Sequence, residues 1–236
     1  MSAKSVALRF VGLAGIALIA ACAPELEGRL YMQDVAEVAA SGQTLVVPAS
    51  LRIPESTAEE CAKGLADLAL KLGEITPISG EGECVELNNS QFSQFTVDLP
   101  LVTETGELAG AYLAVLTVTP ITDDLGPGLA LSLRMNRSLE DVQDAIGRGE
   151  NSGFSISPDD KEQPRFIFAF ENDSRDPVTL TPNFVFVNDA PGLPGVGDPI
   201  VLDRRQSAEI VFSDVVAAHV AAANAFTFAV VHPVGG

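Results

Sequence analysis

Cys22 is the first residue whose chemistry stands out, because it ends an N-terminal segment with a characteristic order of residue types. Lys4 and Arg9 make the start of the chain positive, and residues 10–21 form an apolar run without charge. This order is typical of a secretory signal peptide. The run is also too short to cross a bilayer core, for which a helix needs roughly 20 residues. We therefore expect residues 1–21 to be a signal peptide that contributes nothing to the fold.

The residues around Cys22 indicate a processing step after export. Ile19-Ala20-Ala21-Cys22 resembles the lipobox of bacterial lipoproteins, in which small residues fit a narrow peptidase site and the cysteine thiol receives the lipid. The resemblance implies a lipoprotein precursor that is cleaved before Cys22 and acylated there. Lipoproteins of this class carry two or three acyl chains, whereas a single chain binds a bilayer only marginally. Ala23 then implies the outer membrane, facing the periplasm, with residues 22–28 as a lipidated tether.

Cys61 and Cys84 are the remaining cysteines of the chain. An exported protein folds in an oxidising compartment, where two cysteines favour one disulfide. In the chain-entropy model, a closed loop of this length stabilises the fold by about 3 kcal/mol. A reactive thiol and a metal-binding pair are the alternatives. Both are weakened because the sequence has no C-x-x-C motif and no histidine near either cysteine.

Residues suited to catalysis or metal binding do not form a known motif. His219 lies among alanines and valines, which is more typical of a core or rim position than of a catalytic base. Residues 153–157 fail the G-x-S-x-G pattern at its last position. Acidic pairs at 123–124 and 159–160 could offer oxygen ligands to calcium, but in so acidic a chain they are more typical of solvated loops. The sequence therefore predicts no enzyme, no bound metal and no cofactor.

The charge balance restricts the class of partner. The chain has 14 basic and 32 acidic residues. Removal of the signal peptide takes Lys4 and Arg9 away and leaves a formal charge of −20, from 12 basic and 32 acidic residues. Binding to nucleic acid requires lysine and arginine to neutralise phosphates, so this class of partner is excluded. Electrostatic docking on anionic lipid is disfavoured for the same reason.

Four segments show the spacing and end signals of short helices. The clearest begins after Ser56 and Thr57, which can cap it, and its apolar positions 61, 65, 68 and 72 lie on one stripe. Cys61 is thereby placed on a buried face, and the disulfide is expected to pin the acidic, glycine-rich loop 80–84 onto this helix. The other expected helices cover residues 35–41, 139–147 and 214–223, and Ser138 and Ser213 are the expected caps of the last two.

Apolar runs between these helices predict strands. Residues 95–101 alternate between apolar and polar, and Pro100 indicates a place near an edge. Residues 112–119 are almost all apolar or β-branched, which predicts a central strand. The expected fold class is α+β, a mainly antiparallel β-sheet with three or four short helices packed on it. Two β-rich lobes, residues 29–120 with the disulfide and residues 121–236, would meet near residues 122–128, and one continuous sandwich is the alternative.

The leading functional hypothesis is a non-enzymatic lipoprotein of the cell envelope that binds another envelope component, with the polar loop 151–163 as its contact. The body resembles, in general character, uncharacterised lipoproteins of bacteria and phages. That resemblance suggests a second hypothesis, a phage- or prophage-encoded lipoprotein that blocks a surface receptor and so excludes superinfection. A third hypothesis is a binder of a small apolar ligand in an interior lined by phenylalanines at positions 166, 168, 170, 184 and 186.

Overall fold

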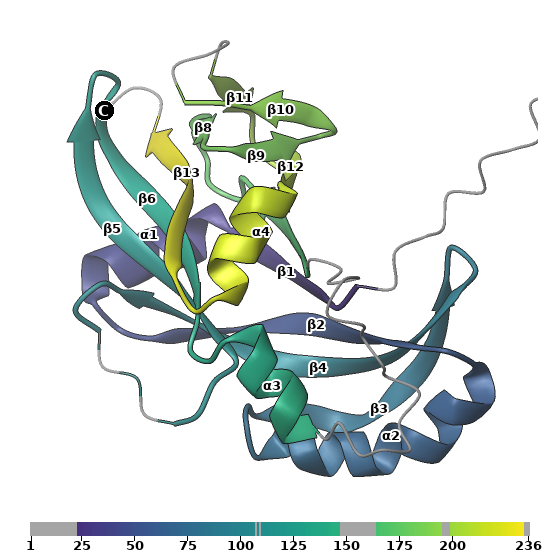
Figure 1. Cartoon of the computed structure of the whole chain (residues 1–236). Helices are drawn as coiled ribbons and strands as arrows, with labels where there is room; N and C mark the ends of the chain where they lie inside the picture. Colours follow the sequence, from purple (N-terminus) through teal and green to yellow (C-terminus); the bar gives the residue numbers. More distant parts are fainter. Residues whose placement is uncertain (1–22, 107, 109, 147–163, 195–198, 234–236) are drawn as a thin grey trace, which may run out of the picture.

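The computed structural model describes residues 23–106, 108, 110–146, 164–194 and 199–233 (Figure 1). Its helices are α1 (Met32–Ser41), α2 (Ala58–Gly73), α3 (Leu139–Ile146) and α4 (Asp214–Ala221). Its strands are β1 (Glu25–Tyr31), β2 (Leu45–Glu55), β3 (Ile78–Leu87), β4 (Ser90–Thr103), β5 (Ala114–Asp123), β6 (Gly126–Met135), β7 (Arg165–Glu171), β8 (Val178–Pro182), β9 (Val185–Val187), β10 (Ala190–Gly192), β11 (Ile200–Leu202), β12 (Ser207–Phe212) and β13 (Ala225–Pro233).

These strands form one curled, mixed sheet. Their order is β10-β9-β12-β7-β1-β2-β4-β5-β6-β13-β8-β11, and β3 pairs with β4 outside this path. The α+β class is confirmed, but the expectation of a mainly antiparallel sheet is corrected, because β1 runs parallel to β7 and β4 runs parallel to β5. The alternation of apolar and polar residues shows which face of a strand is buried, but it does not show whether the neighbouring strand runs parallel or antiparallel.

The sheet joins the two halves of the chain. Glu25 to Tyr31 of β1 pair residue by residue with Arg165 to Glu171 of β7. Residues 122–128, where two lobes were expected to meet, form the end of β5, a two-residue turn at Asp124 and Leu125, and the start of β6, with Asp123 paired to Gly126. Strand β5 runs through residue 120, so the expected boundary falls inside a strand.

The core lies on the inner face of this curl. Phe168 of β7 stacks on Phe228 of β13 with ring centroids 5.6 Å apart, and Phe212 of β12 lies 5.3 Å from Phe228. Complete burial of one such side chain stabilises the fold by roughly 1.5–3 kcal/mol. α4 packs against β13, β6 and β7, and α1 packs against β4 and β5. Strands β7, β12 and β13 therefore contribute side chains to one aromatic cluster.

The expected helices are present, with differences at their ends. Thr57 caps α2, since its side chain accepts a hydrogen bond of 3.1 Å from the backbone N–H of Glu60. Ser138 accepts a hydrogen bond of 3.1 Å from the backbone N–H of Asp141 at the start of α3. Ser213 precedes α4 but makes no side-chain cap, so that expectation was wrong.

Two expectations about the disulfide half are also corrected. Residues 80–84 form part of strand β3 instead of a loop, with a shift of register against β4 between Ser79 and Glu83. Gly82 in this irregular stretch has φ +80°, and a Cβ there would collide with the ring of Phe95. β4 lies inside the sheet, although Pro100 occupies a local gap: β3 pairs with β4 up to Val97, and β5 joins it from Leu101. Proline fits at this position because neither β3 nor β5 accepts a backbone hydrogen bond from it.

Candidate functional site

The chain is held to the folded body directly after Cys22, which itself lies outside the described residues. Ala23 is 2% exposed, and the carbonyl of Pro24 accepts a hydrogen bond of 2.8 Å from the backbone N–H of Arg165. β1 begins at Glu25, with β2 on one side and β7 on the other. The expectation of a tether over residues 22–28 is therefore corrected, because residues 25–28 belong to the sheet.

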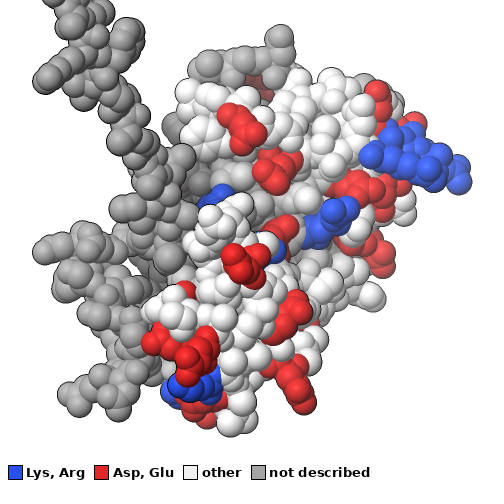
Figure 2. Space-filling view, turned by 90° about the vertical axis from the view of Figure 1, so that its right-hand side faces the viewer, with Lys and Arg blue, Asp and Glu red and all other residues white. Residues whose placement is uncertain are grey.

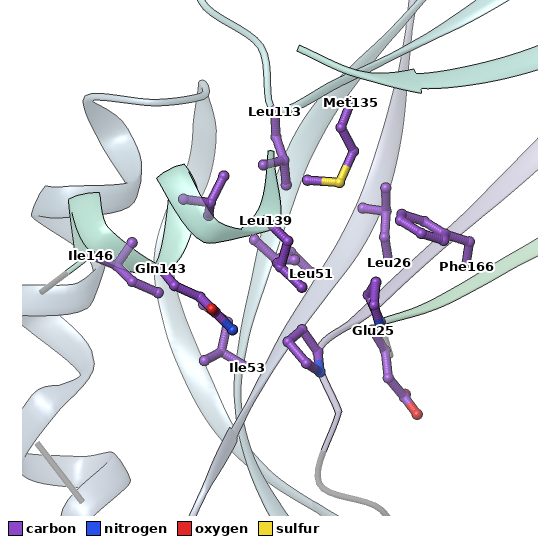
Figure 3. A pocket seen from close by; sticks show the side chains of 13 residues that line it. Glu25, Leu26, Leu51, Ile53, Leu113, Met135, Leu139, Gln143, Ile146 and Phe166 are labelled. Atoms are coloured by element: carbon purple, nitrogen blue, oxygen red, sulfur yellow. The ribbon is translucent and has the colours of Figure 1, made fainter. Parts of the chain in front are cut away.

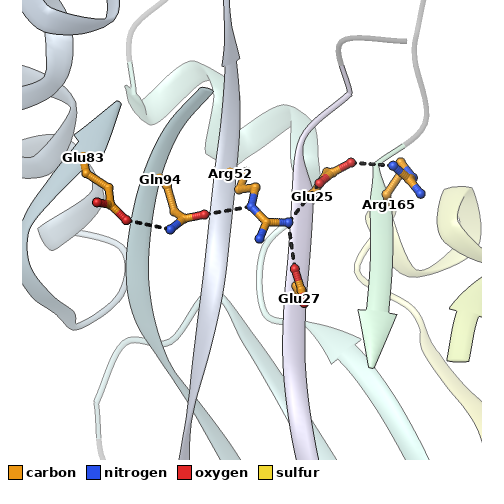
Figure 4. A network of polar contacts seen from close by, with 6 residues as sticks. All are labelled: Glu25, Glu27, Arg52, Glu83, Gln94 and Arg165. Carbon is orange, nitrogen blue, oxygen red and sulfur yellow. Dashed lines mark hydrogen bonds and ion pairs between the residues drawn. The ribbon is translucent and has the colours of Figure 1, made fainter. Parts of the chain in front are cut away.

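Polar side chains lock the start of β1 to its neighbours on the outer face of the sheet (Figure 4). Glu25 Oε1 lies 2.6 Å from Arg165 Nη1, and Glu25 Oε2 lies 3.2 Å from Arg52 Nη1. Arg52 also contacts Glu27 at 2.7 Å and donates through Nε to Gln94 at 2.8 Å. The side chains of Glu25 and Arg52 are only 10% and 16% exposed, so solvent screens their interaction little. The first strand after Cys22 is thus anchored on both sides.

An apolar pocket lies between α3 and the inner face of the same strands (Figure 3). It has a free volume of about 40 Å³, and its lining is almost wholly apolar. Pro24 and Leu26 line it from the start of the chain, and Ile146 from the end of α3. Glu25 also borders the pocket, but Figure 3 shows its carboxylate turned away from the apolar side chains. The same strand end therefore presents ion pairs on one face and an apolar pocket on the other.

The phenylalanines expected to line an apolar interior separate into two groups. Phe166, Phe168 and Phe170 are buried, and Phe166 lines the pocket. Phe184 and Phe186 are instead 50% and 42% exposed, so the predicted single aromatic lining was wrong. Apart from Phe166, the pocket is lined mainly by aliphatic and sulfur-containing side chains, among them Leu51, Leu113, Met135, Leu139 and Val142.

Phe184 has an unusual backbone conformation for a large side chain. Its φ is +53°, in the left-handed region that non-glycine residues rarely adopt. The hydroxyl of Ser213 donates a hydrogen bond of 3.0 Å to the carbonyl of Phe184 and so holds this conformation. Ser213 therefore supports an exposed aromatic residue, in place of the cap that its position predicted.

The disulfide between Cys61 and Cys84 is present and joins α2 to β3, with the two Cα atoms 6.0 Å apart. Cys61 is fully buried, as its place on the apolar stripe predicted. Its sulfur lies 3.3 Å from the hydroxyl of Ser93, which donates a hydrogen bond of 2.5 Å to Glu55. Burial raises the pKa of Glu55; the Ser93 hydrogen bond lowers it, and the charge of Glu60 raises it further, with a net upward shift.

The two histidines have structural surroundings. His232 is 3% exposed; its Nδ1 lies 3.2 Å from the Pro127 carbonyl and its Nε2 lies 3.2 Å from Asp123 Oδ2. His219 packs its ring edge toward Phe226, with centroids 6.1 Å apart. Asp123 also accepts a hydrogen bond from the backbone N–H of Leu125, so it shapes the β5–β6 turn. Within the residues that the structure describes, no group of three or more His, Cys, Asp or Glu side chains could hold a metal ion.

The face of the molecule that Figure 2 shows carries acidic side chains in many places and basic ones in a few. No helix among the described residues has the length and apolar character needed to span a membrane. The candidate serine motif at 153–157, the acidic pair 159–160 and the candidate contact loop 151–163 lie outside the described residues.

A family model described as "Domain of unknown function (DUF7424)" matches residues 24–232 of this chain. The chain belongs to the DUF7424 family. The match covers strands from β1 to β13, so the family unit includes both halves of the sheet and begins two residues after Cys22. Neither the curated proteins nor the solved structures contain a match.

The pocket was the main feature that sequence reasoning missed. The sequence did indicate one wall of the pocket, because the apolar residues Leu139, Val142 and Ile146 share one face of α3. The other walls come from β1, β2, β6 and β7, and no pattern in the sequence shows that these strands meet under α3.

Proposed function

We propose that this protein is a non-enzymatic lipoprotein of the bacterial cell envelope, anchored through acylated Cys22 and engaged in binding another envelope component. The observation that carries the proposal is the lipobox at residues 19–22, which stands directly before the point where the chain enters the sheet. The DUF7424 match begins at residue 24, as expected if the functional unit starts after cleavage. Ala23 after the cysteine supports placement in the outer membrane, facing the periplasm.

Acylation of Cys22 is tested by comparing the wild type with Cys22→Ser in intact cells. We expect the wild type to fractionate with membranes, and its N-terminal peptide to begin at Cys22 with the added mass of the lipid. Cys22→Ser should lose both properties. Ala225→Ser, at an exposed position in β13, is the matched control and should behave as wild type. Identical fractionation of wild type and Cys22→Ser would overturn the lipoprotein assignment.

The binding role is supported by the exposed aromatic pair Phe184 and Phe186. Aromatic side chains carry much of the energy of protein interfaces, and Phe184 is held exposed in a costly backbone conformation. Cross-linking in intact cells followed by identification of co-purified proteins would reveal an envelope partner. A double variant, Phe184→Ser with Phe186→Ser, should lose that partner. Leu70→Ser, which also removes an exposed apolar side chain, should keep it.

A further inference from the structure

We propose that the apolar pocket beside Pro24 holds part of an acyl chain carried by Cys22. This inference rests on the proposed acylation of Cys22 and names a second binding site for the lipid besides the bilayer. It assigns a role to a pocket that the envelope-binding function does not use.

The pocket is within reach of the lipidated cysteine. Pro24 lines the pocket, and its carbonyl is fixed by the backbone of Arg165. Two residues span at most about 7 Å of extended chain, so Cys22 stays this close to Pro24 whatever path the chain takes between them. An acyl chain attached to Cys22 is longer than this separation. The lipid can therefore reach the pocket without any movement of the body.

The chemistry of the lining favours an aliphatic occupant. Leu26, Leu51, Met135 and Phe166 offer carbon and sulfur atoms, and almost no polar group faces the interior. A water molecule inside would lack the two to four polar partners that it needs. Methylene groups need no hydrogen-bond partner, and dispersion contacts with these side chains stabilise them in the pocket. An acyl chain supplies such groups along its whole length.

The size of the pocket restricts the shape of the occupant. A free volume of about 40 Å³ is well below the roughly 150 Å³ of a cavity that admits benzene. A ring-shaped ligand is therefore disfavoured, whereas a segment of a slender hydrocarbon chain fits between α3 and the sheet. The rest of that chain, and the other chains of the anchor, would remain in the bilayer.

The start of β1, beside the pocket, is held by ion pairs. Those of Glu25 with Arg52 and Arg165 fix the strand that follows Cys22 relative to β2 and β7. A flexible tether would let the acyl groups move away from the body. With the strand fixed, the occupied pocket would set the orientation of the whole protein at the membrane.

The test uses cells fed with a fatty acid that carries a photoreactive diazirine. Membranes containing the full-length protein are irradiated, and cross-linked peptides are identified by mass spectrometry. We expect cross-links between the N-terminal lipopeptide and the peptide that contains α3. Leu139→Trp, which places a large ring at the partly exposed rim of the pocket, should abolish them. Val215→Trp, at an 81% exposed position on α4, should retain them, and retention of the Cys61–Cys84 disulfide in both variants would show correct folding.

The outcomes separate the two proposals. A labelled N-terminal peptide that cross-links only to phospholipid would overturn the pocket assignment and leave the lipoprotein intact. An unlabelled N-terminal peptide would overturn the proposed acylation and the pocket assignment together. Cross-links to α3 that persist in Cys22→Ser would identify a free lipid as the occupant, and so contradict the anchor's own chain.

Discussion

At the scale of single residues, two hydrogen-bonded polar side chains, Ser93 and Glu55, lie next to the disulfide. Ser93 is fully buried. Its hydroxyl donates a hydrogen bond to the partly buried carboxylate of Glu55. Among the described residues, Glu55 therefore has a hydrogen-bond partner but no ion-pair partner. Such a carboxylate costs stability when it is ionised.

Glu55→Gln should stabilise the protein at neutral pH. The folded-state pKa of Glu55 lies above its ordinary value of 4.5, so the contribution of this carboxyl group to stability is greatest below that value and is lost as the pH rises through the folded-state pKa. Glutamine keeps an oxygen for Ser93 and carries no charge. Urea unfolding at pH 4 and pH 7 should show a higher midpoint for the variant at pH 7 only. A lower midpoint at pH 7 would mean that ionised Glu55 is favourable.

At the scale of elements, α1 depends on a residue far from it in sequence. Tyr31 occupies the N-cap position and makes no side-chain cap. Asp173 instead accepts a hydrogen bond of 2.9 Å from the backbone N–H of Gln33, and its carbonyl accepts one of 2.6 Å from the Gln33 side chain. Burial first, and then the charges of Asp173 and Glu37, raise the pKa of Asp34 in the first turn. The Asp173 carboxylate therefore caps α1 and at the same time disfavours the ionised form of Asp34.

Asp173→Ala should destabilise the protein by about 1 kcal/mol, the usual effect of removing a cap. Asp173→Asn should retain most of the stability because it keeps an acceptor oxygen. Thermal unfolding measures both, and Asp176→Ala is a control that removes the same charge from an exposed position. Equal effects of Asp173→Ala and Asp176→Ala would indicate that general charge, and not the cap, is responsible.

The Cys61–Cys84 disulfide is the covalent link between α2 and β3. Replacing both cysteines by alanine should cost about 3 kcal/mol in the chain-entropy model for a loop of this size. Denaturant unfolding with and without reductant measures the cost, and the double variant should not respond to reductant. An unchanged wild-type midpoint under reducing conditions, with free thiols verified, would contradict a stabilising role.

At the scale of the whole molecule, the parallel pairing of β1 with β7 is the decisive contact. It places the first strand of the chain between β2 and β7, in the middle of the sheet. Both chain halves consequently share one core, in which Leu30 of β1 and Phe170 of β7 are almost completely buried.

The two halves should therefore unfold together. Hydrogen exchange followed by mass spectrometry, at increasing urea concentration, should show β2 and β12 losing protection at the same midpoint. The reason is that β1 and β7 connect these strands through continuous ladders. Two separated midpoints would support independent lobes. The β5–β6 turn near Gly126 is an internal reference, since exposed turns exchange rapidly under all conditions.

The sequence by itself determined the local features of this protein. The stripe at positions 61, 65, 68 and 72, with Thr57 before it, predicted α2 and the burial of Cys61. Two cysteines in a chain expected to be exported predicted the disulfide. The helix and the burial of Cys61 follow from periodicity and capping within a few residues. The disulfide follows from the number of cysteines and the expected redox environment.

Only the tertiary structure decided the direction of the strands, the capping of α1 by Asp173 and the position of the pocket. Each depends on contacts between segments far apart in the chain, such as Glu25 with Arg165, and periodicity carries no information about such partners. The expected tether failed for the same reason: Leu26 and Gly28 looked like part of a short linker until β2 and β7 supplied the neighbours that make them a strand. The backbone N–H and C=O groups of this segment are paired only because β2 and β7, which come later in the chain, lie beside it.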